Sequence, residues 1–101
     1  MNNQETFQRI VQLISTALSI PSEIILSDSK HCEVIDARYI LVKVLHRYGF
    51  YPTQIAQLLK QSPANIRHII NLYDTRLSTN KQFAYNVQTV YKALENNAFT
   101  P

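Results

Sequence analysis

A single glycine, Gly49, in a chain of 101 residues is the sequence feature that most restricts the fold. A β-rich domain of this size normally needs several glycines, because its tight turns require positive φ angles. Apolar residues in this chain instead recur three and four positions apart, which is the period of an α-helix buried on one side. We therefore expect an all-α domain.

The apolar spacing predicts three helices in the first half of the chain. The first covers residues 5–18, and Pro21 separates it from a short helix over 22–26. After a polar loop, a helix over 33–48 ends at Gly49, which supplies the left-handed residue that helix ends favour. The inward-facing residues are expected to be Phe7, Ile10, Val11, Ile14, Ala17, Leu18, Val34, Ala37, Leu41, Val44, Leu45 and Tyr48.

Prolines mark the start of the next two helices. Pro52 opens one of them, and the pair Lys60-Gln61 forms a tight connection to the other. Ser62 is the predicted N-cap of that second helix and Pro63 its first residue, because a serine oxygen can accept a hydrogen bond from a first-turn N–H group. The expected inward-facing residues are Ile55, Ala56, Leu58, Leu59, Ile66, Ile69, Ile70 and Tyr73.

The last helix is expected to start at Thr79, where Thr79-Asn80-Lys81-Gln82 matches a capping box. Its predicted buried residues are Phe83, Val87, Val90, Tyr91 and Leu94, and we expect residues 96–101 to form a frayed tail. The connections near Gly49 and Lys60 are too short for an up-and-down array. We therefore predict a single domain over 1–101, a compact orthogonal bundle of about five to six helices containing a helix-turn-helix.

Composition narrows the class of protein further. Apolar residues make up 46% of the chain and charged residues 17%, a globular balance. The lone cysteine, Cys32, excludes an intrachain disulfide. No stretch approaches the roughly 20 apolar residues of a membrane span, and the first residues do not resemble a signal peptide. We expect a cytoplasmic protein with no membrane partner.

The sequence contains no arrangement typical of catalysis or of metal binding. His31 and Cys32 are adjacent, but His46 and His68 are not spaced as further ligands. Carboxylates occur singly, no nucleophile has an identifiable base nearby, and no phosphate-binding glycine-rich loop is present. We predict a protein that is not an enzyme and has no metal, no cofactor and no small-molecule substrate. Its oligomeric state stays open, a monomer included.

The segment from Pro52 to Tyr73 is typical of a helix-turn-helix whose second helix enters the major groove of DNA. When the stripe that begins at Ile66 is buried, helical geometry turns a polar flank outward, with no acidic residue before Asp74. Asparagine can pair with adenine, arginine with guanine or phosphate, and alanine with the thymine methyl group. The predicted DNA-binding residues are Ser62, Ala64, Asn65, Arg67, His68 and Asn71. An ordinary helix with a solubilising polar side is the alternative.

A second basic cluster precedes this segment, in a chain whose formal net charge of +3 is compatible with a polyanionic partner. A basic loop can reach into a minor groove, and cations on the following helix can neutralise phosphates. The predicted contacts are Lys30, His31, Arg38, Tyr39, Lys43, His46 and Arg47. Alternatively, the acids among them form ion pairs within the helix, such as Asp36 with a nearby arginine or lysine.

Residues 27–40, Ser-Asp-Ser-Lys-His-Cys-Glu-Val-Ile-Asp-Ala-Arg-Tyr-Ile, resemble the basic loop and helix start of the C-terminal DNA-binding domain of the bacterial replication initiator DnaA. The similarity extends upstream through 7–11 and 24–26 and downstream through 54–56 to the final helix. It implies a Trp-repressor-like helical fold that binds double-stranded DNA sequence-specifically. Because the ATPase of that family resides in a separate upstream domain, the resemblance implies no ATPase activity here.

The resemblance also assigns roles by position. Lys30 corresponds to a family arginine that enters the minor groove. Arg38 and Tyr39 correspond to phosphate and base contacts, and His46 to a later basic position. The family's Arg-Asp-His-Thr-Thr signature is replaced by residues 61–65, Gln-Ser-Pro-Ala-Asn. The resemblance therefore extends to the fold and to phosphate binding more than to the family's own target sequence.

These patterns predict a module that binds double-stranded DNA in replication initiation, in its regulation, or in transcription. The alternative is a protein-interaction module that kept the helical fold and lost DNA binding. The replaced signature and the modest net charge favour that alternative.

Overall fold

The computed structural model describes residues 2–97, which form six helices and no strand. This confirms the predicted all-α bundle of one short and five longer helices. The helices are α1 (Asn3–Leu18), α2 (Ser22–Ile25), α3 (Cys32–Arg47), α4 (Pro52–Leu59), α5 (Pro63–Thr79) and α6 (Lys81–Asn96).

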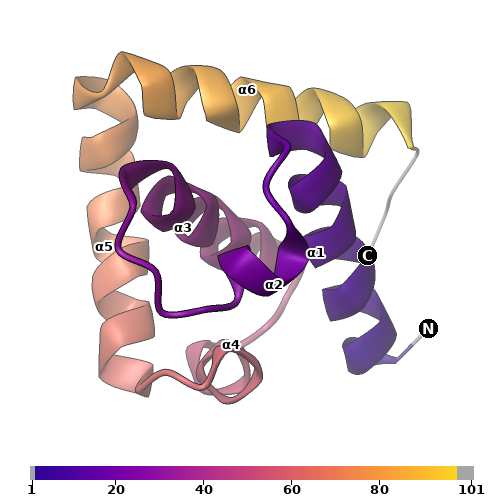
Figure 1. Ribbon diagram of the computed structural model, residues 1–101. Coiled ribbons are helices and arrows are strands. Elements are labelled where there is room, and N and C mark those ends of the chain that lie inside the picture. Colours follow the sequence, from indigo (N-terminus) through magenta and orange to yellow (C-terminus); the bar gives the residue numbers. More distant parts are fainter. Residues whose placement is uncertain (1, 98–101) are drawn as a thin grey trace.

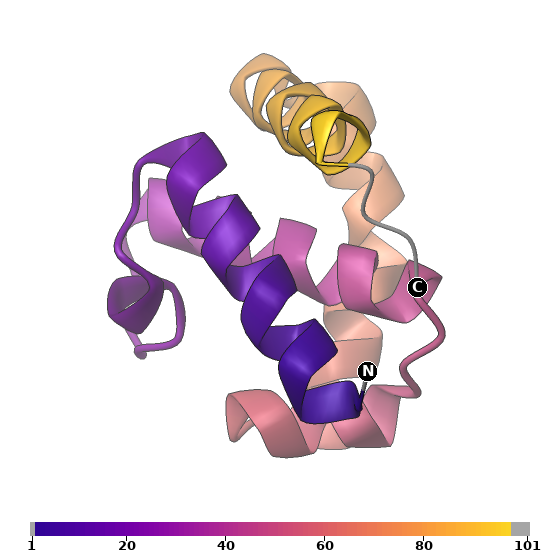
Figure 2. The ribbon, with the colours of Figure 1, turned by 90° about the vertical axis from the view of Figure 1, so that its right-hand side faces the viewer.

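Helix α3 runs through the middle of the bundle and packs against each of the other five helices. Figure 1 shows α5 and α6 meeting at a corner beside it, with α1 on the opposite side and α4 below. In the turned view of Figure 2, α1 crosses in front of α3 and α6 lies above both. The short connections thus make successive helices cross, as expected for an orthogonal bundle.

The buried residues agree with the predicted stripes and add to them around α3. Most predicted positions on α1, α4, α5 and α6 are buried. The partly buried ones are Ala17, Leu18, Leu58, Leu59, Ile70 and Tyr91. On α3, Ile40 and Val42 are fully buried in addition to the predicted positions. A one-sided stripe could not predict them, because α3 has neighbours on several sides.

Gly49 takes the backbone conformation predicted for it. Its φ angle is +97°, and its N–H group donates to the carbonyl oxygen of His46 at 3.1 Å after α3 has ended at Arg47. A residue with a Cβ atom is strained at such an angle, so glycine suits this turn.

The boundary between α5 and α6 differs from the sequence prediction. Thr79 is the last residue of α5 and does not cap α6; its Oγ1 donates back to the carbonyl oxygen of Thr75 at 2.7 Å. Asn80 is the N-cap instead, and its Oδ1 accepts from the N–H group of Phe83 at 2.9 Å. At the other end, Asn96 belongs to α6 and not to a frayed tail, and Asn97 is the C-cap. Residues 98–101 of the predicted tail lie outside the described residues.

The alternative pairing of Asp36 within its own helix is not formed. Asp36 is buried, and its Oδ1 accepts a hydrogen bond from Nε of Arg76 in α5 at 3.0 Å. The guanidinium of Arg76 also lies over the ring of Tyr39, 4.4 Å from its centroid. The partner of Asp36 thus comes from the far half of the chain and joins α3 to α5.

None of the helices within residues 2–97 combines the length and the apolar character needed to cross a bilayer.

Candidate nucleic-acid interface

Helices α4 and α5 form the predicted helix-turn-helix, joined by residues 60–62. Lys60 adopts a left-handed conformation with a φ angle of 57°, which reverses the chain after α4. The N–H group of Gln61 then donates to the carbonyl oxygen of Ala56 at 2.9 Å, closing the turn. The turn is therefore fixed by backbone hydrogen bonds, which set where α5 begins.

Ser62 is the N-cap of α5, as predicted, and Pro63 is the first residue of the helix. The Ser62 Oγ accepts from the N–H group of Asn65 at 3.1 Å. This bond, together with the absence of an N–H group in proline, leaves few first-turn donors for an anion. The hydroxyl hydrogen of Ser62 can still be donated to a phosphate oxygen while its oxygen accepts.

The predicted polar flank of α5 lies on the protein surface. Its side chains are Ala64, Asn65, Arg67, His68 and Asn71, all exposed, whereas Ile66, Ile69 and Tyr73 face inward. Asn65 is also oriented, because its Nδ2 donates to Oε1 of Gln61 at 2.8 Å. One Nδ2 hydrogen and the Oδ1 of Asn65 remain for a base edge, which is the pair that adenine recognition uses.

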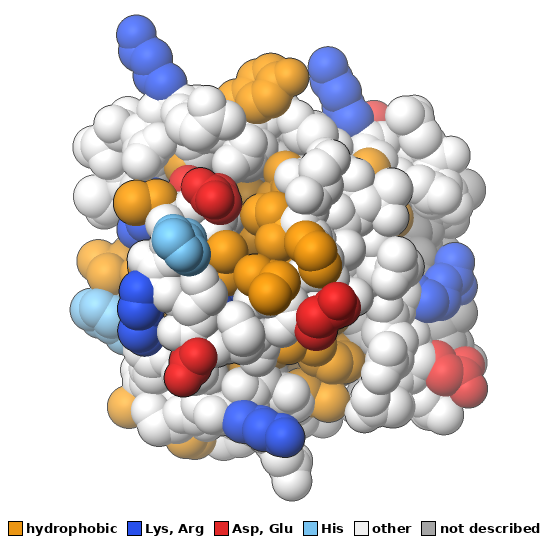
Figure 3. Space-filling model, viewed as in Figure 1, with side chains coloured by type: hydrophobic (Ala, Val, Ile, Leu, Met, Phe, Trp, Pro, Cys, Tyr) orange, Lys and Arg blue, Asp and Glu red, His pale blue; other side chains and the backbone are white. Residues whose placement is uncertain are grey.

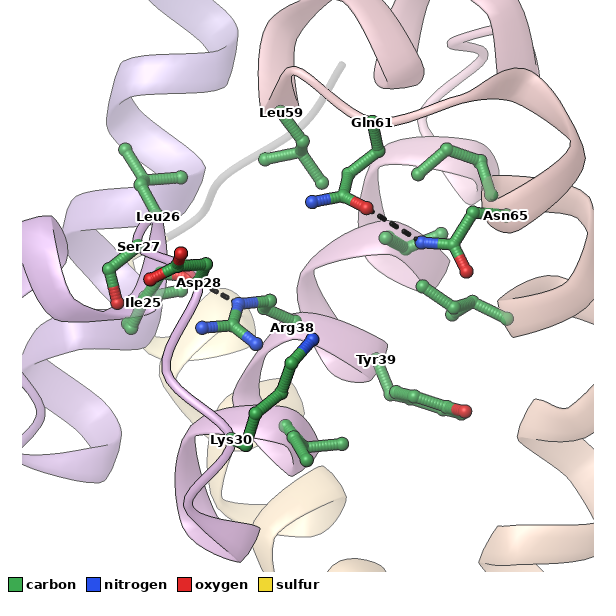
Figure 4. Close-up of a pocket in the computed structure, with 14 residues that line it drawn as sticks. Ile25, Leu26, Ser27, Asp28, Lys30, Arg38, Tyr39, Leu59, Gln61 and Asn65 are labelled. Atoms are coloured by element: carbon green, nitrogen blue, oxygen red, sulfur yellow. Dashed lines mark hydrogen bonds between the residues drawn. The ribbon is translucent and has the colours of Figure 1, made fainter.

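A cavity of about 170 Å³ lies between the 27–30 loop, α3 and the start of α5. Figure 4 shows Asp28, Lys30 and Arg38 on one side of it and Leu59, Gln61 and Asn65 on the other. The fold thus brings three residues of the predicted basic cluster, namely Lys30, Arg38 and Tyr39, to the same place as Asn65 of the predicted recognition helix.

Arg38 is partly buried in the wall of this cavity. Its Nε donates to the carbonyl oxygen of Ile25 at 2.9 Å and so ties the end of α2 to α3. Burial lowers the pKa of the Arg38 guanidinium from its ordinary value, and the carboxylate of Asp28 acts in the opposite direction. One guanidinium nitrogen, Nη2, is buried and has no hydrogen-bond partner within residues 2–97.

The other predicted cations of α3 lie away from this cavity. The Nζ of Lys43 sits 5.2 Å from the ring centroid of Tyr73. Arg47, in the last turn of α3, stacks on Tyr91 of α6 with its Cζ 5.2 Å from the ring centroid. His46 is exposed in the same turn. These residues do not line the cavity, so the fold divides the second basic cluster into two parts.

The remaining predicted residues lie beside the cavity and on its wall. His31 is exposed at the N-cap of α3, and its N–H group donates to Ser29 Oγ at 3.3 Å. Tyr39 is partly buried and packs edge-on against Phe83, with ring centroids 6.4 Å apart. Packing on Phe83 and under the guanidinium of Arg76 holds the Tyr39 ring in place.

Charged side chains are spread out on one face of the molecule. Figure 3 shows lysines and arginines standing apart on the face it views, with acidic side chains between some of them. One acid, Asp28, lines the same cavity as Lys30. A polyanion on this face would therefore be held by individual side chains more than by a broad positive field.

Sequence reasoning missed two residues at this site. Gln61 was treated as part of a connection, although its spacing of four from Asn65 is the spacing at which amide side chains pair near a helix start. The second is Asp28, whose position beside Arg38 depends on how the loop folds back on α3. No spacing rule predicts that contact.

Among residues 2–97, no group of three or more histidine, cysteine, aspartate or glutamate side chains is placed to hold a metal ion. Comparison of the chain with protein-family models, with curated protein sequences and with solved structures finds no match. The resemblance to the DnaA domain therefore stays a prediction.

Proposed function

We propose that this chain is a DNA-binding module that places the start of α5 in the major groove of double-stranded DNA. The observation that carries the proposal is the flank Ala64, Asn65, Arg67, His68 and Asn71, which is exposed and free of acidic residues within a capped helix that follows a tight turn. A helix presented in this way is the element that helix-turn-helix proteins use to read base edges.

Asn65 and Arg67 are the proposed base-reading residues. Gln61 restricts the rotation of the Asn65 amide, so less conformational freedom is lost when the amide pairs with adenine. Arg67 is exposed one residue beyond the buried Ile66 and can reach either guanine or a phosphate. Ala64 offers a methyl group that fits beside a thymine methyl group.

Phosphate contacts are assigned to residues that flank α5. Ser62 can donate its hydroxyl hydrogen, and Lys30 lines the cavity next to the start of α5. His31 is exposed one residue after Lys30 and is assigned to a phosphate as well. Arg38 contributes its charge from the cavity wall. Lys43, His46 and Arg47 lie further along α3 and would act on a more distant part of the backbone.

The resemblance to the C-terminal domain of DnaA supports a role in replication initiation, in its regulation, or in transcription. The proposal includes sequence-specific binding and no catalytic activity, ATPase activity included. Because residues 61–65 replace the family signature, the target sequence is expected to differ from that of the family and is best found by selection from randomised duplexes.

The proposal is tested by fluorescence anisotropy of a labelled duplex titrated with protein at several salt concentrations. The logarithm of the binding constant should fall linearly with the logarithm of salt, by about 0.9 per phosphate contact. Arg67→Gln and Lys30→Gln should each reduce that slope by about one contact. Lys92→Gln, at an exposed position in α6, is the matched control and should leave the slope unchanged.

Two double variants distinguish the loss of contacts at the proposed interface from a general effect of added negative charge. Ala64→Glu with Asn65→Glu should abolish duplex binding and preserve the fold, because acids suit the first turn of a helix. Gln82→Glu with Gln88→Glu adds the same charge on exposed positions of α6 and should have little effect. No binding by the unmodified chain at low salt would contradict the proposal and favour the protein-interaction alternative.

A further inference from the structure

The cavity between the 27–30 loop and α5 has the size and the lining of a small-molecule site. Its volume is about 170 Å³, and a protein cavity of roughly 150 Å³ is large enough for benzene. Much of its lining is aliphatic, contributed by Ile25, Ile35, Val42, Leu59, Ile66 and Ile69. An apolar ring or branched chain would therefore find matching surface there.

The polar part of the lining favours a ligand that carries a single negative charge. Arg38 Nη2 is a buried donor with no acceptor within residues 2–97, while Nε of the same group is used by the carbonyl oxygen of Ile25. Because Nη2 is covered by the protein, the guanidinium acts on the cavity through its charge. Lys30 adds a second positive charge and Asp28 one negative charge, so the three side chains sum to one positive charge.

We propose that this cavity binds a small organic monoanion, with its carboxylate against Lys30 in the field of the Arg38 guanidinium and its apolar body against the aliphatic wall. Figure 4 shows both side chains at the cavity. Inorganic phosphate, or a phosphate of DNA, would bring charge without a body to cover the aliphatic side chains. The ligand is bound and not transformed. The proposal does not depend on DNA binding.

A ligand in the cavity should also change the affinity of the protein for duplex DNA. This consequence rests on the proposed function. Lys30 and Asn65 line the cavity and are both assigned to the DNA interface. A carboxylate held by Lys30 competes with phosphate for the same ammonium group. The ligand should therefore weaken duplex binding.

The test uses the full chain without DNA, with benzoate as the probe. Titration followed by amide correlation NMR should give saturable shifts for residues that line the cavity, including Lys30, Arg38 and Asn65. Benzamide, which has the same body without the charge, should bind at least about ten-fold more weakly, because hydrogen bonds to charged groups are the stronger ones. Inorganic phosphate should bind similarly weakly, because it lacks the apolar body.

Substitutions of charged residues test whether benzoate binds in the cavity. Lys30→Gln should weaken benzoate binding by about five-fold, and Asp28→Asn, which removes the opposing charge, should strengthen it by about five-fold. Lys92→Gln in α6 should leave it unchanged. Circular dichroism confirms that each variant is folded.

The proposal is overturned if benzoate gives no saturable shifts, if benzamide or phosphate binds as well as benzoate, or if Lys30→Gln and Lys92→Gln behave alike. Duplex titrations with and without benzoate then separate the two proposals. Benzoate binding without any duplex binding leaves the ligand site standing and contradicts the proposed function. Duplex binding without benzoate binding supports the proposed function and contradicts the ligand site.

Discussion

The pair Asp36–Arg76 joins the central helix to the proposed recognition helix. The Asp36 side chain is 8% exposed, and its Oδ1 lies 3.0 Å from Nε of Arg76. Arg76 is covered in turn by the rings of Tyr39 and Phe83. A buried carboxylate without a partner is costly, so α5 is held where Arg76 can reach Asp36.

Arg76→Ala should therefore destabilise the fold far more than the loss of a surface arginine. We expect the free energy of unfolding to fall by about 2–4 kcal/mol, because the carboxylate is left buried and unpaired. Arg67→Ala, on the exposed flank of the same helix, should change it by less than about 0.5 kcal/mol. Urea unfolding measures both.

Adding Asp36→Asn to the Arg76→Ala variant removes the stranded charge and should restore part of the lost stability. Equal stability of the Arg76→Ala and Arg67→Ala variants would show that the ion pair does not hold α5 in place.

For single residues, the sequence predicts hydrogen bonds to near neighbours in the chain but not contacts between distant residues. The Ser62 cap was predictable because its partner, the N–H group of Asn65, is three residues away. The partner of Asp36 is 40 residues away, and no periodicity indicates it. The alternative of a pairing within the helix was therefore wrong.

The boundary between α5 and α6 consists of one residue that serves two helices. Asn80 has an extended backbone and is both the C-cap of α5, through its N–H group, and the N-cap of α6, through its side chain. The cap at Asn80 also starts α6 where Phe83 packs edge-on against Tyr73, with ring centroids 5.5 Å apart. Both terminal turns depend on this asparagine.

Asn80→Ala should lower the free energy of unfolding by about 1 kcal/mol, the usual contribution of an N-cap side chain. Thr79→Ala, one residue earlier, should cost less, because Thr79 Oγ1 only returns a hydrogen bond to its own helix. Thermal or urea unfolding of the two variants measures both losses of stability. A larger loss from Thr79→Ala would mean that the cap lies at Thr79 after all.

The helices themselves were largely predictable, because each has an apolar stripe and a start or stop signal of its own. Pro52, Pro63 and Gly49 stand at helix ends, as expected. The prediction was incomplete on α3, because its burial on several sides requires knowing which helices surround it.

For the whole molecule, the sequence predicted the exposed flank of α5 but not what lies next to it. Burial of Ile66 and Ile69 fixes the direction of that flank from helix geometry alone. The cavity forms only where the loop at 27–30 folds next to residues 61–69, so it depends on tertiary contacts. Other tertiary contacts place Lys43 and Arg47 over the rings of Tyr73 and Tyr91.

The proposed function requires that DNA lies against the start of α5. Titration of the labelled chain with duplex DNA, followed by amide correlation NMR, tests this claim most directly. The proposed function predicts that the largest shifts fall on residues 62–71 and on the loop at 28–31, with small shifts along the second half of α6. Shifts confined to α1 and α6, or none at low salt, would contradict it.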